Sequence, residues 1–93
     1  MTHAEIMTRA TAEAERRGFA LVAIYARPEV GEAITLCLTS RGGDPWAVYR
    51  FSTARDRLSE GAYYYSREEA RAEFKERLDE FFDVWHLRRP EIA

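Results

Sequence analysis

The segment YYYSREEARAEFKERLDEFFDVW, residues 63–85, is the longest stretch of the chain with a single clear periodicity. Its apolar side chains recur every three or four residues, which places them on one side of an α-helix. They are Ala70, Phe74, Leu78, Phe81 and Trp85. Because an isolated helix of this length is only marginally stable in water, we expect this apolar side to be buried against the rest of the protein.

The start of this helix is indicated by Ser66, which is followed three residues later by Glu69. In such a capping box the serine hydroxyl accepts from the Glu69 amide, and the glutamate carboxylate accepts from the Ser66 amide. Neither glycine nor proline occurs again until Pro90, so nothing in the segment should end the helix early.

Carboxylates form a second row along the same predicted helix. Its members are Glu69, Glu73, Glu76, Glu80 and Asp83. Like charges at these spacings repel by about 0.2–0.5 kcal/mol per pair, and anions near the C-terminal end also oppose the helix dipole. Arg77, four residues after Glu73, offsets part of this repulsion. The row has two interpretations, the solvated side of an acidic helix and a binding surface for a partner.

The remainder of the chain predicts one more helix and four strands. Thr2 and Glu5 form a capping box at the start of the first helix, and Gly18 can end it. Apolar or alternating segments then predict strands at residues 19–26, 33–39, 46–52 and 62–65, with a charged connection at residues 53–61. The order is α-β-β-β-β-α. It predicts an α+β protein, a two-layer sandwich in which the N- and C-terminal helices pack on one face of an antiparallel meander of three to four strands.

In this arrangement the second face of the sheet would be open to solvent. We expect it to present Trp46, Arg50 and Tyr64, residue types that are enriched at the centres of interfaces. An exposed apolar patch of this kind would mark a partner-binding or dimerisation surface. The alternative is that curvature of the strands turns this face partly inward.

Composition limits the possible classes of function. The 93 residues are expected to form a single domain, residues 1–93, and the net charge of −2 provides no strong attraction to nucleic acid. Cys37 is the only cysteine, which excludes an internal disulfide. No apolar run approaches the length of a membrane span, so we expect a cytoplasmic protein without a membrane partner. Lys75 is the only lysine beside thirteen arginines, a bias typical of GC-rich bacterial or phage genes.

The sequence contains no motif for catalysis, a metal or a cofactor. His3, Cys37 and His86 are far apart and on different predicted elements, whereas a metal site needs at least three well-spaced ligands. No nucleophile with a nearby base and no phosphate-binding glycine loop is present. We therefore expect a protein that is not an enzyme and binds no metal or cofactor.

Three functions remain open. The first is a small protein-binding module that presents its acidic helix, or an aromatic sheet face, to a nucleic-acid-binding partner complex. Compact acidic inhibitors encoded by phages and mobile elements, including anti-CRISPR proteins, fit that description. The second is a nucleic-acid-binding domain that uses a basic edge made of Arg41, Arg50, Arg55 and Arg57. The third is a homodimer formed through the sheet face.

Overall fold

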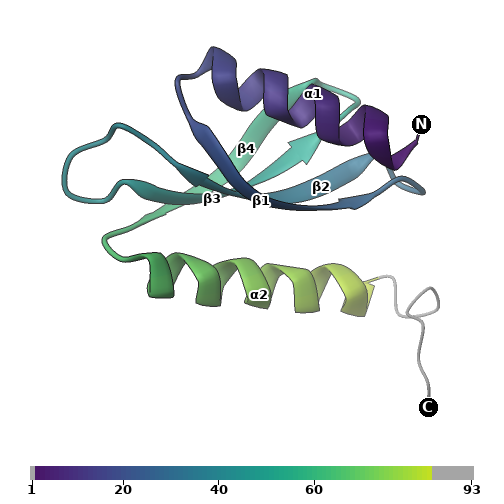
Figure 1. Cartoon of the computed structure of the whole chain (residues 1–93). Coiled ribbons are helices and arrows are strands. Elements are labelled where there is room, and N and C mark those ends of the chain that lie inside the picture. The colour runs from purple at the N-terminus through teal and green to yellow at the C-terminus, as the bar shows by residue number, and fades with distance from the viewer. Residues whose placement is uncertain (1, 85–93) are drawn as a thin grey trace.

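A computed structural model describes the backbone of residues 2–84 and the side chains of residues 2–80. The element order confirms the predicted α-β-β-β-β-α arrangement and the α+β class (Figure 1). The elements are α1 (His3–Arg16), β1 (Ala20–Arg27), β2 (Glu32–Leu38), β3 (Trp46–Ser52), β4 (Arg57–Tyr64) and α2 (Arg67–Val84).

The four strands form one open antiparallel sheet in the order β1-β2-β3-β4, as expected for a meander. Leu36 at the centre of β2 pairs with Ala23 of β1 and Val48 of β3. The register shifts once between β1 and β2, after Leu21, and once between β3 and β4, after Val48. Both irregularities involve an edge strand, where bulges are common.

Strand β4 begins at Arg57, whereas the sequence analysis placed residues 53–61 in a connection. The prediction was wrong because this strand lies at the edge of the sheet, where charged side chains are exposed to solvent and conceal the strand pattern. Leu58 is its one fully buried apolar residue before Gly61, and it pairs with Phe51 of β3.

The two helices lie on opposite faces of the sheet, so the expected placement of both on one face is wrong (Figure 1). The buried side of α1 packs in one core with Phe51 and Leu58; its members are Ile6, Ala10 and Ala14. Ala70 of α2 belongs to a second core with Ile34, Leu36 and Val48, against which Phe74 and Leu78 also pack. The protein therefore has three layers, with the sheet between the helices.

The cause of this arrangement is that β2 and β3 are apolar on both sides. Successive strand residues point to opposite faces, so Ala33 faces α1 while its neighbour Ile34 faces α2. Ala47 and Val48 divide in the same way between the two cores. A two-layer sandwich would leave one of these apolar faces in water, and α2 covers it instead.

Tyr49 closes the core beneath α1 by packing against the backbone of the edge strand. Its ring stacks on Phe19 with 5.8 Å between ring centroids, and its hydroxyl is hydrogen-bonded to that of Tyr63. A Cβ added to Gly61 would lie 2.3 Å from the Tyr49 ring. The absence of a side chain at Gly61 is thus what allows Tyr49 to lie flat against β4.

We predict that Gly61→Ala destabilises the protein by about 1–3 kcal/mol, because overpacking a well-filled site forces a side chain or the backbone to move. Urea unfolding monitored by circular dichroism measures the change. Gly42→Ala is the matched control, since a Cβ there has nothing within 4 Å. An equal effect of the two substitutions would contradict the packing of Tyr49 on Gly61.

Candidate functional site

The start of α2 has the capping geometry that its sequence predicts. The Glu69 amide donates to Ser66 Oγ at 3.2 Å, and the Ser66 amide donates to Glu69 Oε1 at 3.2 Å. The capping box of α1 is confirmed in the same way by Thr2 and Glu5. Each helix therefore starts at a defined residue, and this sets which side chains of α2 face solvent.

The acidic row of α2 is divided between solvent and the sheet. Glu69, Glu76 and Glu80 are exposed, whereas Glu73 is half-buried. Arg77 Nε donates to Glu73 Oε2 at 2.7 Å, so an ion pair within the helix balances the charge of this carboxylate. The side chain of Asp83, like those of Phe81 and Trp85 on the predicted apolar side, lies outside the described residues.

Cations of α2 occupy the other flank of the helix. Arg71 and Lys75 are exposed and four residues apart, which places them together. At 100° per residue, Arg71 lies on the opposite side of the helix from Glu69. We call the exposed carboxylates Glu69, Glu76 and Glu80 the acidic flank. Glu68 and Asp79 are also exposed, and at 100° per residue they lie beside Arg71 and Lys75. Charge is therefore mixed on that flank, whereas the acidic flank presents only carboxylates to solvent.

The residues expected on an open sheet face, Trp46, Arg50 and Tyr64, lie on the face that α2 covers. Each is half-buried. Trp46 and Tyr64 pack against the core beneath α2, and Arg67 lies over the Trp46 ring at 5.9 Å. The premise of an uncovered sheet face is therefore wrong, since α2 shields these side chains. Partner binding by these three residues and dimerisation through the sheet stay predictions, but an uncovered sheet face no longer supports them.

Tyr64 connects the acidic helix to the sheet beneath it. Burial raises the pKa of its hydroxyl, and the nearby Glu73 carboxylate raises it further. The tyrosine is therefore neutral at physiological pH and can act as a hydrogen-bond donor toward Glu73.

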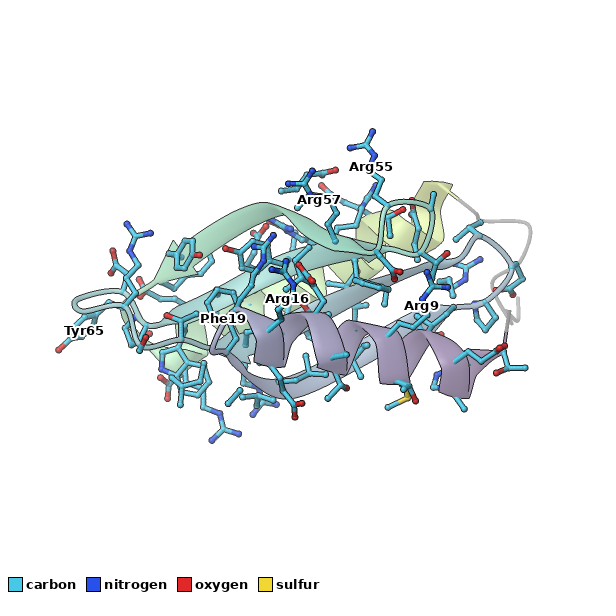
Figure 2. All side chains as sticks on the ribbon, turned by 90° about the horizontal axis from the view of Figure 1, so that it is seen from above. Arg9, Arg16, Phe19, Arg55, Arg57 and Tyr65 are labelled. Carbon is cyan, nitrogen blue, oxygen red and sulfur yellow. The ribbon has the colours of Figure 1, made fainter. Side chains whose placement is uncertain are left out.

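The arginines proposed for nucleic-acid binding do not form one surface. Arg50 lies on the face beneath α2 with Glu32 3.9 Å away, and Arg41 lies in the loop between β2 and β3. Arg55 and Arg57 lie at the β3–β4 turn and the start of β4 (Figure 2). The predicted basic edge is therefore split among three places.

A cluster that the sequence analysis missed lies at the C-terminal end of α1. Glu13 is only 7% exposed and accepts hydrogen bonds from Arg16 Nε and Nη2, both at 2.9 Å, and from Arg17 Nε at 3.1 Å. Arg17 Nη2 also donates to the Leu58 carbonyl of β4 at 3.0 Å. One buried carboxylate thus orients two guanidinium groups. The spacing of Glu13 to Arg16 and Arg17, three and four residues, was the available signal.

The other end of α1 is closed by an ion pair. Arg9 Nε donates to Asp56 Oδ1 at 2.8 Å, and Arg9 Nη2 donates to the Thr53 carbonyl at 3.2 Å. A shallow hollow of about 360 Å³ lies between this end of the helix and the β3–β4 turn, lined by Arg9, Ala12, Glu13, Arg16 and Asp56. Both arginines of the hollow already face carboxylates, so its charges are satisfied within the protein.

Metal chemistry has no support in the described part of the chain, where no three His, Cys, Asp or Glu side chains gather as a metal site would require. Cys37 is fully buried and burial raises the pKa of its thiol, which keeps it protonated and unreactive. His86 lies outside the described residues. Over residues 2–84, neither helix is long and apolar enough to cross a membrane.

None of the protein families, curated protein sequences or solved structures with which we compared the chain is a match.

We predict a pH-dependent contribution of Glu13 to stability. Hydrogen bonding from Arg16 holds the pKa of Glu13 below its ordinary value of 4.5. A carboxyl whose pKa is lower in the folded state stabilises the protein above its unfolded pKa, and the stabilisation is lost as the pH falls through the folded pKa. At neutral pH, Glu13→Gln should cost about 1–3 kcal/mol, as expected for a buried group bonded to charged donors.

Urea unfolding of the wild type and Glu13→Gln as a function of pH measures this contribution. The difference between the two proteins should narrow as the pH falls below 4.5. The exposed Glu15 on the same helix provides the control, because Glu15→Gln should change stability little at any pH. A Glu13→Gln deficit that is constant with pH would show that the carboxylate is not the stabilising group.

Proposed function

We propose that this chain is a non-enzymatic protein-binding module whose acidic flank binds the nucleic-acid site of a partner protein. The observation that supports the proposal most directly is that the acidic flank of α2 exposes three carboxylates with no cation among them, whereas Arg71 and Lys75 lie on the other flank together with Glu68 and Asp79. Solvation alone requires charged side chains on a helix surface but does not require a row of carboxylates without a cation. Such a row carries a cost in repulsion, and positions that break a local rule are often functional.

The dimensions of the acidic flank suit a site built for a phosphate backbone. With a rise of about 1.5 Å per residue, Glu69 and Glu80 lie about 16 Å apart along the helix. Successive phosphates on one strand of duplex DNA lie about 3.4 Å apart along the axis. The flank therefore spans about the length of five phosphates, and a basic channel of that length would attract it electrostatically.

The packing of α2 supports a rigid presentation of these charges. The capping box defines its first turn, and Ala70, fully buried, joins it to the sheet with Phe74 and Leu78. A preorganised surface loses less conformational entropy on binding than a flexible one. The proposed activity is stoichiometric inhibition by occupancy of the partner's site, in the manner of compact acidic inhibitors of phage or mobile-element origin, and it requires no catalytic group.

The proposal is tested with immobilised wild type and two charge-reversal variants used to capture proteins from an extract of the source cells. In Glu76→Lys/Glu80→Lys the exposed flank is reversed while Glu69 is kept, because Glu69 also caps the helix. We expect this variant not to capture the proteins that the wild type captures. Added polynucleotide should release those proteins from the wild type, since polynucleotide and the acidic flank would occupy the same basic site of the partner. Association should also weaken with salt.

Glu15→Lys/Asp44→Lys is the matched control, because it makes the same change in net charge at exposed positions away from α2. It should retain the same proteins as the wild type. Capture that is equal for all three baits, or that polynucleotide does not compete, would contradict the proposed role of the acidic flank.

A further inference from the structure

A second surface lies on the opposite side of the sheet, beyond the C-terminal end of α1. It combines guanidinium groups with partly exposed aromatic rings, and we call it the arginine–aromatic surface. Its members are Arg16, Arg17, Phe19, Arg41 and Tyr63. They come from the end of α1, the start of β1, the β2–β3 loop and β4. In Figure 2, Phe19 lies just beyond the end of α1 that carries Arg16.

The cationic part of this surface is held in place. Arg16 and Arg17 share the buried Glu13 carboxylate, and Arg17 is also bound to the Leu58 carbonyl of β4. The Arg16 side chain remains 70% exposed despite its ion pair. Two guanidinium groups therefore share one carboxylate, so the cluster keeps a positive charge and its orientation is set before any ligand arrives.

The aromatic part continues from this cluster without a gap. Arg17 lies over the Tyr49 ring at 5.5 Å, and Tyr49 stacks on Phe19. Tyr63 meets Tyr49 edge to face, with 5.9 Å between ring centroids, and Arg41 lies over the Tyr63 ring at 4.4 Å. Phe19 and Tyr63 are half-buried, so part of each ring remains accessible. The three rings thus form one contiguous cluster, with Arg17 at one end and Arg41 at the other.

We propose that the arginine–aromatic surface binds single-stranded nucleic acid. Guanidinium groups bind phosphate oxygens, and both aromatic rings and guanidinium planes stack on unpaired bases. Cationic groups combined with accessible rings are what tracks a single strand without reading its sequence. The Glu13 carboxylate is already occupied by Arg16 and Arg17 and does not face the ligand as a free charge.

Duplex nucleic acid fits this surface less well. The bases of a duplex are stacked on each other and cannot lie on Phe19 or Tyr63. Groove binding by α1 would need cations on its outward side, but that side carries Thr8, Ala12 and Glu15 and no cation. The surface therefore favours an unpaired strand of a few nucleotides.

This inference is independent of the acidic flank. The two surfaces lie on opposite faces of the sheet (Figure 1). Charges separated by more than the screening length of about 8 Å at physiological salt hardly influence each other, so the acids on the outer side of α2 do not cancel the arginines. The proposed function can fail while this inference holds, and the reverse is equally true.

The test uses fluorescence anisotropy with a labelled fifteen-nucleotide oligothymidine and the corresponding duplex. For wild type we expect a Kd between about 1 and 100 µM at low salt, a range that stronger non-specific binders show at physiological salt. With three guanidinium contacts, log K should fall against log salt with a slope of about −2, because each contact on a single strand contributes about 0.7. The duplex should bind more weakly.

Arg16→Gln/Arg41→Gln removes a cation from each end of the surface, and we expect it to weaken oligothymidine binding about tenfold and to reduce the slope by about 1.4. Arg71→Gln/Lys75→Gln on α2 is the matched control, with the same change in net charge, and should bind like the wild type. Should the double variant unfold, Arg41→Gln alone, in the β2–β3 loop, should reduce the slope by about 0.7.

Three results would overturn the inference. The first is the absence of salt-dependent oligothymidine binding by the wild type; if salt-sensitive self-association is seen in its place, the surface is assigned to the acidic flank of a second copy. The second is an equal loss of binding in the surface variant and the α2 control. The third is duplex binding as tight as single-strand binding, which would assign the surface to another ligand.

Discussion

The structure depends on one packing constraint, the apolar character of β2 and β3 on both of their faces. Ala33 and Ile34, neighbours in the chain, are each almost fully buried, yet they point to opposite sides of the sheet. A strand of this kind is stable only between two covering layers. Helix α1 provides one layer and α2 the other. Each fully buried apolar side chain contributes about 1.5–3 kcal/mol, so neither cover can be removed without a large loss of stability.

This constraint also determines what the protein presents to solvent. Because each helix covers its own face, the acidic flank of α2 and the arginine–aromatic surface near α1 lie on opposite sides of the sheet, as the helices do in Figure 1. A net charge of −2 therefore describes neither surface. Small side chains allow α1 to pack closely, since Ala10 meets the core that contains Ala33 and Ala47. Larger side chains, Phe74 and Leu78, fill the space beneath α2.

Local features of the fold could be predicted from the sequence, whereas relations across the sheet could not. The capping box at Ser66 and the buried position of Ala70 follow from residue spacing along one helix, where geometry is fixed by the 3.6-residue turn. The face to which a helix docks is a non-local choice that spacing does not encode. The early start of β4 was hidden by the charged side chains of this edge strand. The role of Glu13 depended on the burial of its side chain, which residue spacing does not show. The carboxylates of α2 were predicted as one row, but Glu73 pairs with Arg77 and does not belong to the exposed acidic flank.

The most direct test of this account is the set of nuclear Overhauser contacts made by the methyl groups of the two helices. The account predicts contacts from the Ala70 methyl group to the methyl groups of Ile34 and Val48, and from the Ala10 methyl group to Ala33 and the Phe51 ring. Contacts from Ala70 to Ala33 or Phe51 would place both helices on one face. That result would contradict the three-layer arrangement and the separation of the two charged surfaces.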